Sequence, residues 1–236
     1  MKILLRFFFR LLYHQFAFTY DLVAAMVSFN RWQDWVTSVI PFIEGSRILE
    51  IGHGPGHLQQ ILFSRNVSAI GIDESTQMGR LAKRNLTRFF TMETNSNPIT
   101  QHRAYAQINL TRGIAQQLPF PSESFDTVVS TFPAEYIYDP ETLTEAERVL
   151  TPAGRFVILP GAVITGRGTR DRALALLFRL TGQTPPDLSE ILHQRSKVAF
   201  AKAGFQVEVH EIEVKSSLVF IMIATKPQMT PEAHHA

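Results

Sequence analysis

The sequence predicts an α/β fold in which helices cover both faces of a doubly wound, mostly parallel sheet of seven strands. Three observations support this prediction. Apolar strand patterns and helical patterns alternate five times along the middle of the chain, which is typical of parallel sheets with crossover helices. A glycine-rich turn follows the first of these strands, at the position where such sheets bind ligands. Two strand-like segments close the chain and are near enough in sequence to pair, so that the last strand is expected to be antiparallel.

The expected strands are short apolar runs bounded by polar or glycine-containing segments. They lie at 47–51, 68–73, 106–111, 125–131 and 155–160, with a final pair formed by "FQVEVHEIEV" and "LVFIMIATK". Helical spacing of apolar residues predicts helices at about 2–28, 31–43, 57–65, 75–90, 141–150, 171–181 and 188–203.

Composition restricts the function classes. The chain has 236 residues, which suits one sizeable domain rather than two. Its net charge of +2, from 23 Lys and Arg against 21 Asp and Glu, lacks the strong basic bias of a nucleic-acid-binding protein. There is no cysteine, which excludes disulfides, cysteine-ligated zinc and thiol catalysis and suits a cytoplasmic protein. Carboxylates and histidines show no metal-ligand spacing, so no metal is expected.

The segment 1–16, "MKILLRFFFRLLYHQF", is apolar but carries a basic stripe at Lys2, Arg6 and Arg10. It is too short to span a bilayer, which takes about 20 apolar residues. Two interpretations stay open: the segment docks on its own domain, or it lies on an anionic membrane as an interfacial helix. We therefore expect an N-terminal helical segment at 1–43 in a cytoplasmic protein, which the second interpretation makes peripheral at the membrane.

The turn "EIGHGPGH" places Gly52, Gly54 and Gly56 two residues apart after the first strand. Dinucleotide-binding turns instead have the spacing G-x-G-x-x-G. Glu50 stands just before the first glycine, where it would repel a pyrophosphate but attract a cationic amine. Asp73 ends the second strand, and a carboxylate at this position accepts the hydroxyls of a ribose. These residues indicate a ligand that combines a ribose with a cationic group.

Four segments in register make the sequence similar to a known family: "ILEIGHGPGHL", "GIDESTQM", "RGIAQQLPFPSESFDTVVSTF" and "TLTEAERVLTPAGRFVILP". They resemble the class I S-adenosylmethionine-dependent methyltransferases of the type 11 branch, and among these the ubiquinone/menaquinone biosynthesis methyltransferases. The resemblance covers about residues 16–160. It implies a Rossmann-like fold, S-adenosyl-L-methionine as the cofactor and methyl transfer to a small-molecule acceptor, with no nucleic acid as partner.

The resemblance also implies which residues contact the cofactor. The three glycines would hold its methionine part, with Glu50 near the ammonium group, and Asp73 would bind the ribose. The other expected contacts are Glu74 and Met78 beside the adenosine, Ile114 and Ala115 at the adenine edge, and Thr131 on the fourth strand. Ile114 departs from the family, which usually has an aspartate there that hydrogen-bonds the adenine amino group. Two interpretations stay open: the cofactor binds more weakly, or Gln116 or Gln117 replaces that contact.

Composition, rather than a motif, indicates the acceptor. The 18 phenylalanines favour a hydrophobic acceptor, such as a lipid or a quinone, which would bind under a lid at 161–187. The methyltransferase domain is expected at 44–228, followed by a disordered tail at 229–236. A general base is needed only when the acceptor must lose a proton, and the candidates are Tyr20, Tyr136 and His193.

Two other functions stay open. A nicotinamide-dependent oxidoreductase also uses a glycine turn and a ribose-binding acid, although the glycine spacing disfavours it. A methyltransferase-like module that binds the cofactor or a membrane surface without catalysis would be compatible with the isoleucine at position 114. The sequence predicts no oligomeric state.

Overall fold

The structure is a computed structural model, which describes residues 31–93, 108–165 and 198–228. Within these residues, seven strands form one sheet in the order β3-β2-β1-β4-β5-β7-β6. The strands are β1 (Ile48–Ile51), β2 (Ala69–Asp73), β3 (Asn109–Arg112), β4 (Phe125–Thr131), β5 (Leu150–Ile164), β6 (Gln206–Val214) and β7 (Ser217–Thr225). The predicted number of strands and their order along the chain are therefore confirmed.

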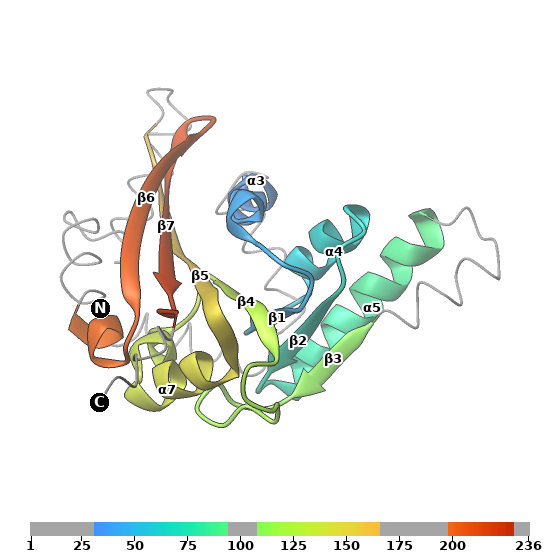
Figure 1. Cartoon of the computed structure of the whole chain (residues 1–236). Coiled ribbons are helices and arrows are strands. Elements are labelled where there is room, and N and C mark those ends of the chain that lie inside the picture. Colours follow the sequence, from blue (N-terminus) through green and yellow to red (C-terminus); the bar gives the residue numbers. More distant parts are fainter. Residues whose placement is uncertain (1–30, 94–107, 166–197, 229–236) are drawn as a thin grey trace, which may run out of the picture.

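Neighbouring strands are parallel except around β7. β1 pairs in parallel with both β2 and β4, so that Leu49 lies opposite Ile70 on one side and Val128 on the other. β7 runs antiparallel to β5 and to β6, which confirms the predicted antiparallel last strand. The strand order reverses between β1 and β4 (Figure 1). The carboxyl ends beside such a switch point are where doubly wound sheets bind their ligands.

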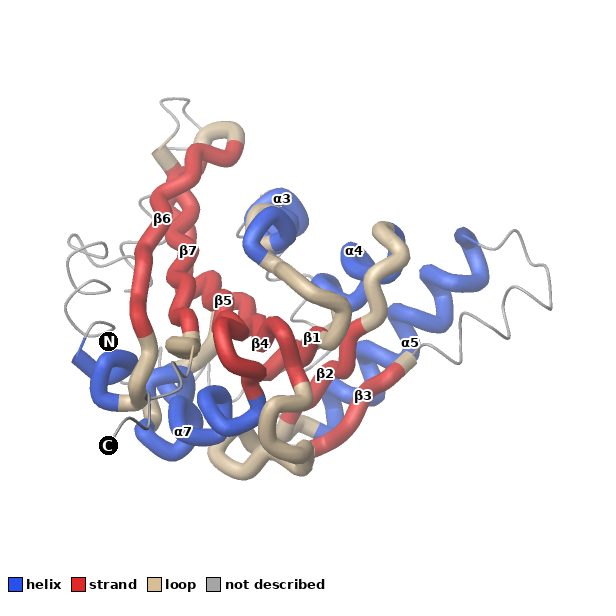
Figure 2. The backbone as a smooth tube through the Cα atoms, viewed as in Figure 1, coloured by secondary structure: helices blue, strands red, loops and turns tan. Residues whose placement is uncertain are grey.

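Helices pack on both faces of the sheet, because strand side chains alternate between the faces. Ile48 of β1 lies in one core cluster with Leu58, whereas Leu49 and Ile51 lie in the other cluster with Leu143. Figure 2 shows the helices that carry these partners on either side of the strands. The helices are α3 (Trp32–Thr37), η1 (Ile40–Phe42), α4 (His57–Ser64), α5 (Thr76–Glu93), η2 (Glu135–Tyr138) and α7 (Pro140–Val149), and residues 198–202 are also helical.

The predicted helix at 31–43 is shorter than expected. α3 ends at Thr37, and a single 3-10 turn follows with Pro41 at its centre. Proline cannot donate a backbone hydrogen bond and clashes with the preceding turn of an α-helix, which explains why the regular helix does not continue. Trp35 and Val36 of α3 are nevertheless buried against the sheet.

β5 is longer than the predicted strand at 155–160. It continues to Ile164 and pairs with β7 from Gly161 opposite Phe220 to Ile164 opposite Ser217. Residues 161–164 therefore belong to the sheet rather than to the expected lid at 161–187. Residues 166–187 of that lid lie outside the described residues, as do residues 1–30 and the tail at 229–236.

Candidate functional site

The turn after β1 contains three glycines with positive φ angles: 73° at Gly52, 51° at Gly54 and 86° at Gly56. Residues with a side chain are strained in this region. A Cβ on Gly52 would collide with the Tyr136 hydroxyl, and a Cβ on Gly56 would lie 3.3 Å from that of Ala82 in α5. A Cβ on Gly54 would have no atom within 4 Å. Gly54 therefore faces open space, as the backbone at a ligand-binding turn must.

Asp73, the last residue of β2, ties this turn to the second strand. Its Oδ2 accepts the Gly54 N–H at 2.9 Å, and its Oδ1 accepts the Ser75 N–H at 2.8 Å. The Ile72 carbonyl accepts the N–H of Gly52 at 2.8 Å. An ionised carboxylate has about four lone-pair sites, so each oxygen of Asp73 keeps the capacity to accept a further hydrogen bond. Two adjacent hydroxyls of a ribose could each donate a hydrogen bond to one of these oxygens.

Glu50 lies in β1, and only 1% of its surface is exposed. Gln59 Nε2, from α4, donates to Glu50 Oε2 at 2.7 Å. Burial raises the pKa of Glu50 to about 8; the hydrogen bond from Gln59 opposes this rise, and the charge of Asp73 contributes to it. A nearby cation favours the ionised form of such a carboxyl. A positively charged ligand at the turn would therefore stabilise the ionised form of Glu50.

Tyr136 lies in η2, directly after β4, and its hydroxyl is placed over Gly52. Burial raises the pKa of the Tyr136 phenol to about 12, and the negative charges of Asp73, Glu50 and Glu74 contribute to the rise. The phenol is therefore neutral at physiological pH. Acidic side chains and a neutral phenol thus surround the glycine turn, an environment that favours a cation over a pyrophosphate.

Four of the other predicted contacts lie near the carboxyl ends of β2, β3 and β4. Met78 is buried near the start of α5, where its N–H donates to Ser75 Oγ at 3.2 Å. Thr131 is the last residue of β4. Ala115 is buried, whereas 44% of the Ile114 surface is exposed. These residues thus lie at the carboxyl ends of the strands, where sheets of this fold class bind their ligands.

Glu74 directly follows β2, and its carbonyl accepts a hydrogen bond from Arg112 Nε at 3.0 Å; its side chain is exposed. The two glutamines expected to replace the missing aspartate differ in their surroundings. Gln116 Nε2 donates to Asp139 Oδ2 at 3.3 Å. Gln117 is exposed, and its side-chain amide forms no hydrogen bond within the described part of the chain. Gln117 is therefore the one whose amide is available to a ligand.

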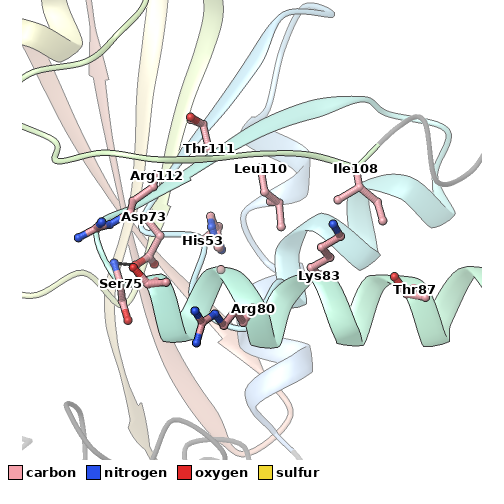
Figure 3. Close-up of a pocket in the computed structure, with 12 residues that line it drawn as sticks. His53, Asp73, Ser75, Arg80, Lys83, Thr87, Ile108, Leu110, Thr111 and Arg112 are labelled. Carbon is pink, nitrogen blue, oxygen red and sulfur yellow. Dashed lines mark hydrogen bonds between the residues drawn. The ribbon is translucent and has the colours of Figure 1, made fainter.

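A cavity of about 720 Å³ lies between α5 and β3 (Figure 3). Of the residues expected to contact the cofactor, only Asp73 lines this cavity. Arg80, Lys83 and Arg112 give it positive charge, and Leu110 gives it an apolar wall. Sequence reasoning missed the cavity because, apart from Asp73 and His53, its lining comes from residues 75–87 and 108–112, which carry no motif.

His53, inside the glycine turn, also lines this cavity (Figure 3). Its Nδ1 lies 2.8 Å from the Gly54 carbonyl, and burial lowers its pKa. Since a carbonyl only accepts, Nδ1 carries the proton of a neutral imidazole. His53 thus stabilises the turn.

Within residues 31–93, 108–165 and 198–228, no three His, Cys, Asp or Glu side chains are placed to hold a metal ion. None of the helices described there is long and apolar enough to cross a membrane. Tyr20, His193 and the segment 1–16 lie outside the described residues.

Comparison with known proteins finds similarity to methyltransferases. Residues 49–158 match the family model described as "Methyltransferase domain". A demethylmenaquinone methyltransferase of Symbiobacterium thermophilum is 30% identical over 158 residues, which are 64% of this chain and 57% of that protein. Over these residues the chain is similar to the S-adenosylmethionine-dependent methyltransferases. A second methyltransferase, the phosphatidylethanolamine N-methyltransferase of Cereibacter sphaeroides, is 34% identical over 116 residues, 49% of this chain and 50% of that protein. The chain thus spans little more than half the length of these relatives.

Solved structures share the methyltransferase fold. Phosphoethanolamine N-methyltransferase 2 of Haemonchus contortus, in complex with phosphomonomethylethanolamine and S-adenosylhomocysteine, has a TM-score of 0.58 at 18% identity, over 92% of this chain and 59% of that one. The YcgJ protein of Bacillus subtilis has a TM-score of 0.53 at 18% identity, over 83% of this chain and 99% of that one. These likenesses confirm the predicted Rossmann-like class.

The residues of the turn fit the methyltransferase cofactor, S-adenosyl-L-methionine. This molecule joins a ribose to a sulfonium and an ammonium group. The open face of Gly54 leaves room for a ligand, Asp73 has acceptor capacity for ribose hydroxyls, and buried Glu50 is stabilised in its charged form by a cation.

Proposed function

We propose that the protein transfers a methyl group from S-adenosyl-L-methionine to a small hydrophobic acceptor of the lipid or quinone type. The observation that carries this proposal is the acidic lining of the glycine turn. Glu50 and Asp73 stand at the ends of neighbouring strands, and Tyr136 adds a neutral hydroxyl. A cationic nucleoside suits this lining because it stabilises the ionised form of Glu50, whereas the pyrophosphate of a nicotinamide dinucleotide gains nothing from Glu50 and would lie close to the acidic Asp73.

The proposed cofactor contacts follow from this arrangement. The turn of Gly52, Gly54 and Gly56 holds the methionine part, with the open face of Gly54 toward it. Glu50 balances the positive charge of the ligand, and Asp73 binds the ribose. Met78 offers a soft apolar surface to the adenosine. The remaining proposed contacts are Glu74, Ile114, Ala115 and Thr131.

When bound, the cofactor supplies an activated methyl group that a nucleophile on the acceptor displaces in line. The part of the chain in such a reaction is to bind, to orient and to exclude water. Tyr136 keeps its proton at neutral pH because burial raises its pKa to about 12, which favours a role other than general base. Tyr20 and His193 remain candidates for a base, and an acceptor that attacks through a neutral amine needs none in the transfer step.

Two kinds of support favour a hydrophobic acceptor. The chain contains 18 phenylalanines. Its relatives include a demethylmenaquinone methyltransferase and a phosphatidylethanolamine N-methyltransferase. An acceptor of this kind is most accessible at a membrane surface, so we also propose that the protein works in the cytoplasm with peripheral membrane contact through residues 1–16.

A non-catalytic module is the second candidate, and one observation favours it. The position expected to recognise adenine is occupied by Ile114, which cannot accept a hydrogen bond. Formation of S-adenosylhomocysteine distinguishes the two candidates, because only the enzyme produces it in the presence of an acceptor.

The test begins with the purified full-length protein. Calorimetry with S-adenosyl-L-methionine, S-adenosylhomocysteine and NADH is expected to show binding of the first two and none of the third. Membrane lipid and quinone extracts are then incubated with the protein and a methyl-labelled cofactor, and mass spectrometry identifies the labelled product. A labelled lipid or quinone supports the proposal. Binding of NADH, or cofactor binding without S-adenosylhomocysteine formation in any extract, contradicts it.

A further inference from the structure

We propose that the cavity between α5 and β3 is a second binding site, which takes a phosphate monoester that carries an apolar group. Arg80 and Lys83 of α5 would contact the phosphate, and Ile108 and Leu110 would contact the apolar group. The proposal goes beyond methyl transfer and does not depend on it, because the cavity extends away from the glycine turn.

The position of the cavity is the first argument. On the helix side it is lined from Thr76 to Thr87, which lie about 16 Å apart at a rise of about 1.5 Å per residue. On the strand side it is lined from Arg112, at the carboxyl end of β3, back to Ile108, which precedes the amino end of that strand. The part around Thr87 and Ile108 therefore lies far from the end that contains Asp73 (Figure 3).

Unbalanced positive charge in the cavity is the second argument. Arg80 and Lys83 are three residues apart on α5, which makes them neighbours on the helix surface. Both are exposed, and neither forms an ion pair or a hydrogen bond with the residues that the structure describes. Arg112 adds a third cation at the end next to Asp73 (Figure 3), and Asp73 is the single acidic residue of the described lining. Two positive charges are therefore left for a ligand to balance.

The apolar strand side is the third argument. Ile108 and Leu110 are two residues apart and both line the cavity, as expected for one face of a strand. They are half-buried and pack against the core cluster of Leu86 and Phe90. Figure 3 shows the Lys83 side chain directed from α5 toward these two apolar residues. The cavity therefore presents positive charge and hydrocarbon side by side.

These features together favour a phosphate monoester with an apolar group. The monoester carries a charge of about −1.5 to −2 at neutral pH and so balances the two cations, whereas a carboxylate carries only one charge. Arginine binds phosphate oxygens through its forked N–H groups, and lysine binds them as a point charge. The Thr87 hydroxyl in the lining is a further donor. Such a group occurs both in soluble phosphate esters and in the headgroup of phosphatidic acid.

Hexyl phosphate is the probe for the experiment, because it joins a phosphate monoester to a short apolar chain. An NMR titration of the full-length protein is expected to shift the backbone amides of Lys83, Thr87 and Leu110. Glycerol phosphate keeps the charge without the apolar chain, and hexanoate keeps the chain with a single charge. Each is expected to bind about two- to fivefold more weakly than hexyl phosphate.

Charge-removing variants test the two cations. Lys83→Gln and Arg80→Gln are each expected to lower the affinity for hexyl phosphate by about two- to fivefold. Arg88→Gln is the matched control, because it removes the same charge from an exposed position of α5 that does not line the cavity. Its affinity is expected to equal that of the wild type. Circular dichroism and the melting temperature verify that the three variants are folded.

Vesicles distinguish the two sources of the phosphate. Co-sedimentation uses phosphatidylcholine vesicles with and without phosphatidic acid. If Lys83→Gln binds vesicles with phosphatidic acid less than Arg88→Gln does, the ligand is a lipid headgroup. If the two variants bind these vesicles equally while only Lys83→Gln loses hexyl phosphate affinity, the ligand is a soluble ester. Both results support the proposed site.

Three results would overturn the proposal. The first is an affinity for hexyl phosphate that is unchanged in Lys83→Gln and Arg80→Gln, or reduced as much in Arg88→Gln. The second is a set of NMR shifts confined to the glycine turn. The third is displacement of hexyl phosphate by S-adenosylhomocysteine, which would show that the cavity belongs to the cofactor site. A protein that binds hexyl phosphate in the cavity but no cofactor would support the second site and contradict the proposed function.

Discussion

The carboxylate of Asp73 accepts the backbone N–H of Gly54 at 2.9 Å across 19 residues of sequence. Its second oxygen accepts the N–H of Ser75 at 2.8 Å. The residue proposed to bind the ribose therefore also shapes the turn that is proposed to hold the methionine part. A substitution at Asp73 changes both functions together, so its effect on binding has to be separated from its effect on the fold.

Asp73→Ala is expected to abolish measurable cofactor binding. It also removes two hydrogen bonds to backbone amides, each of which contributes about 1 kcal/mol, so the free energy of unfolding should fall by about 2 kcal/mol. Calorimetry measures the first effect and urea denaturation the second.

Asp126→Ala is the matched control for this variant. Asp126 lies near the amino end of β4, where its Oδ2 accepts the backbone N–H groups of Ser46 and Arg47, both at 3.1 Å, and its Oδ1 forms an ion pair with the Arg47 side chain. This variant should lose stability to a similar or smaller extent, because these bonds are exposed, and should keep its cofactor affinity. A cofactor affinity that is the same in Asp73→Ala and in the wild type would contradict the assignment of the ribose site.

Gly54→Val is expected to fold and to lose cofactor binding. The φ angle of Gly54 is 51°, so a side chain is strained there, but nothing in the described structure lies within 4 Å of the added Cβ. The cost to stability should be about 1–2 kcal/mol. The valine side chain would occupy the open space that faces the turn. Calorimetry and thermal melting provide the two measurements.

Gly204→Val controls for backbone strain alone. Gly204 has a φ angle of 87° and also has no atom within 4 Å of an added Cβ, and it precedes β6, away from the turn. Both variants should therefore melt at lower temperatures, and only Gly54→Val should fail to bind. If Gly204→Val also loses binding, the loss reflects global destabilisation and the turn is not identified as the site.

Much of the site could be predicted from the sequence because its residues follow one another along the chain. Glu50, the three glycines and Asp73 are contiguous with the strands that position them, so that spacing alone indicated that they lie together at the turn; their roles toward the cofactor stay predictions. The same is true of β7, whose apolar run predicted a buried strand. A sequence pattern is therefore sufficient to predict a feature that lies within a single strand, helix or turn.

Features that depend on tertiary contact could not be predicted in this way. Gln59 belongs to a helical face, and nothing in its spacing shows that its amide reaches Glu50. The contact between Tyr136 and Gly52 joins the ends of two strands through a 3-10 turn. The extension of β5 to Ile164 depends on pairing with β7, because the segment that contains Gly161 has little intrinsic strand preference.

Glu50→Gln is expected to change how stability depends on pH. The pKa of Glu50 is about 8 in the folded protein, raised from 4.5 mainly by burial. Between these two values the folded state holds a proton that the unfolded state has released. Stability should therefore fall as the pH rises from about 5 to 8, with a slope of at most about 1.4 kcal/mol per pH unit.

Glu50→Gln should remove this slope, since a neutral amide has no proton to release, and should be more stable than the wild type near pH 8. Urea denaturation at several pH values measures the effect. Glu135→Gln, which changes an exposed carboxylate, should keep the slope of the wild type. A wild-type stability that is flat over this range would show that Glu50 is ionised throughout.

Ile114→Asp is expected to strengthen cofactor binding. The resemblance to the family places an adenine-binding aspartate at this position, and 44% of the Ile114 surface is exposed, so a carboxylate there stays hydrated before the ligand binds. One new hydrogen bond to the adenine amino group contributes about 1 kcal/mol, which corresponds to about fivefold in affinity. Ile114→Ala, which shortens the side chain without adding an acceptor, should bind no more tightly than the wild type. Calorimetry on the three proteins measures the effect, and equal affinities of Ile114→Asp and the wild type would place position 114 away from the adenine.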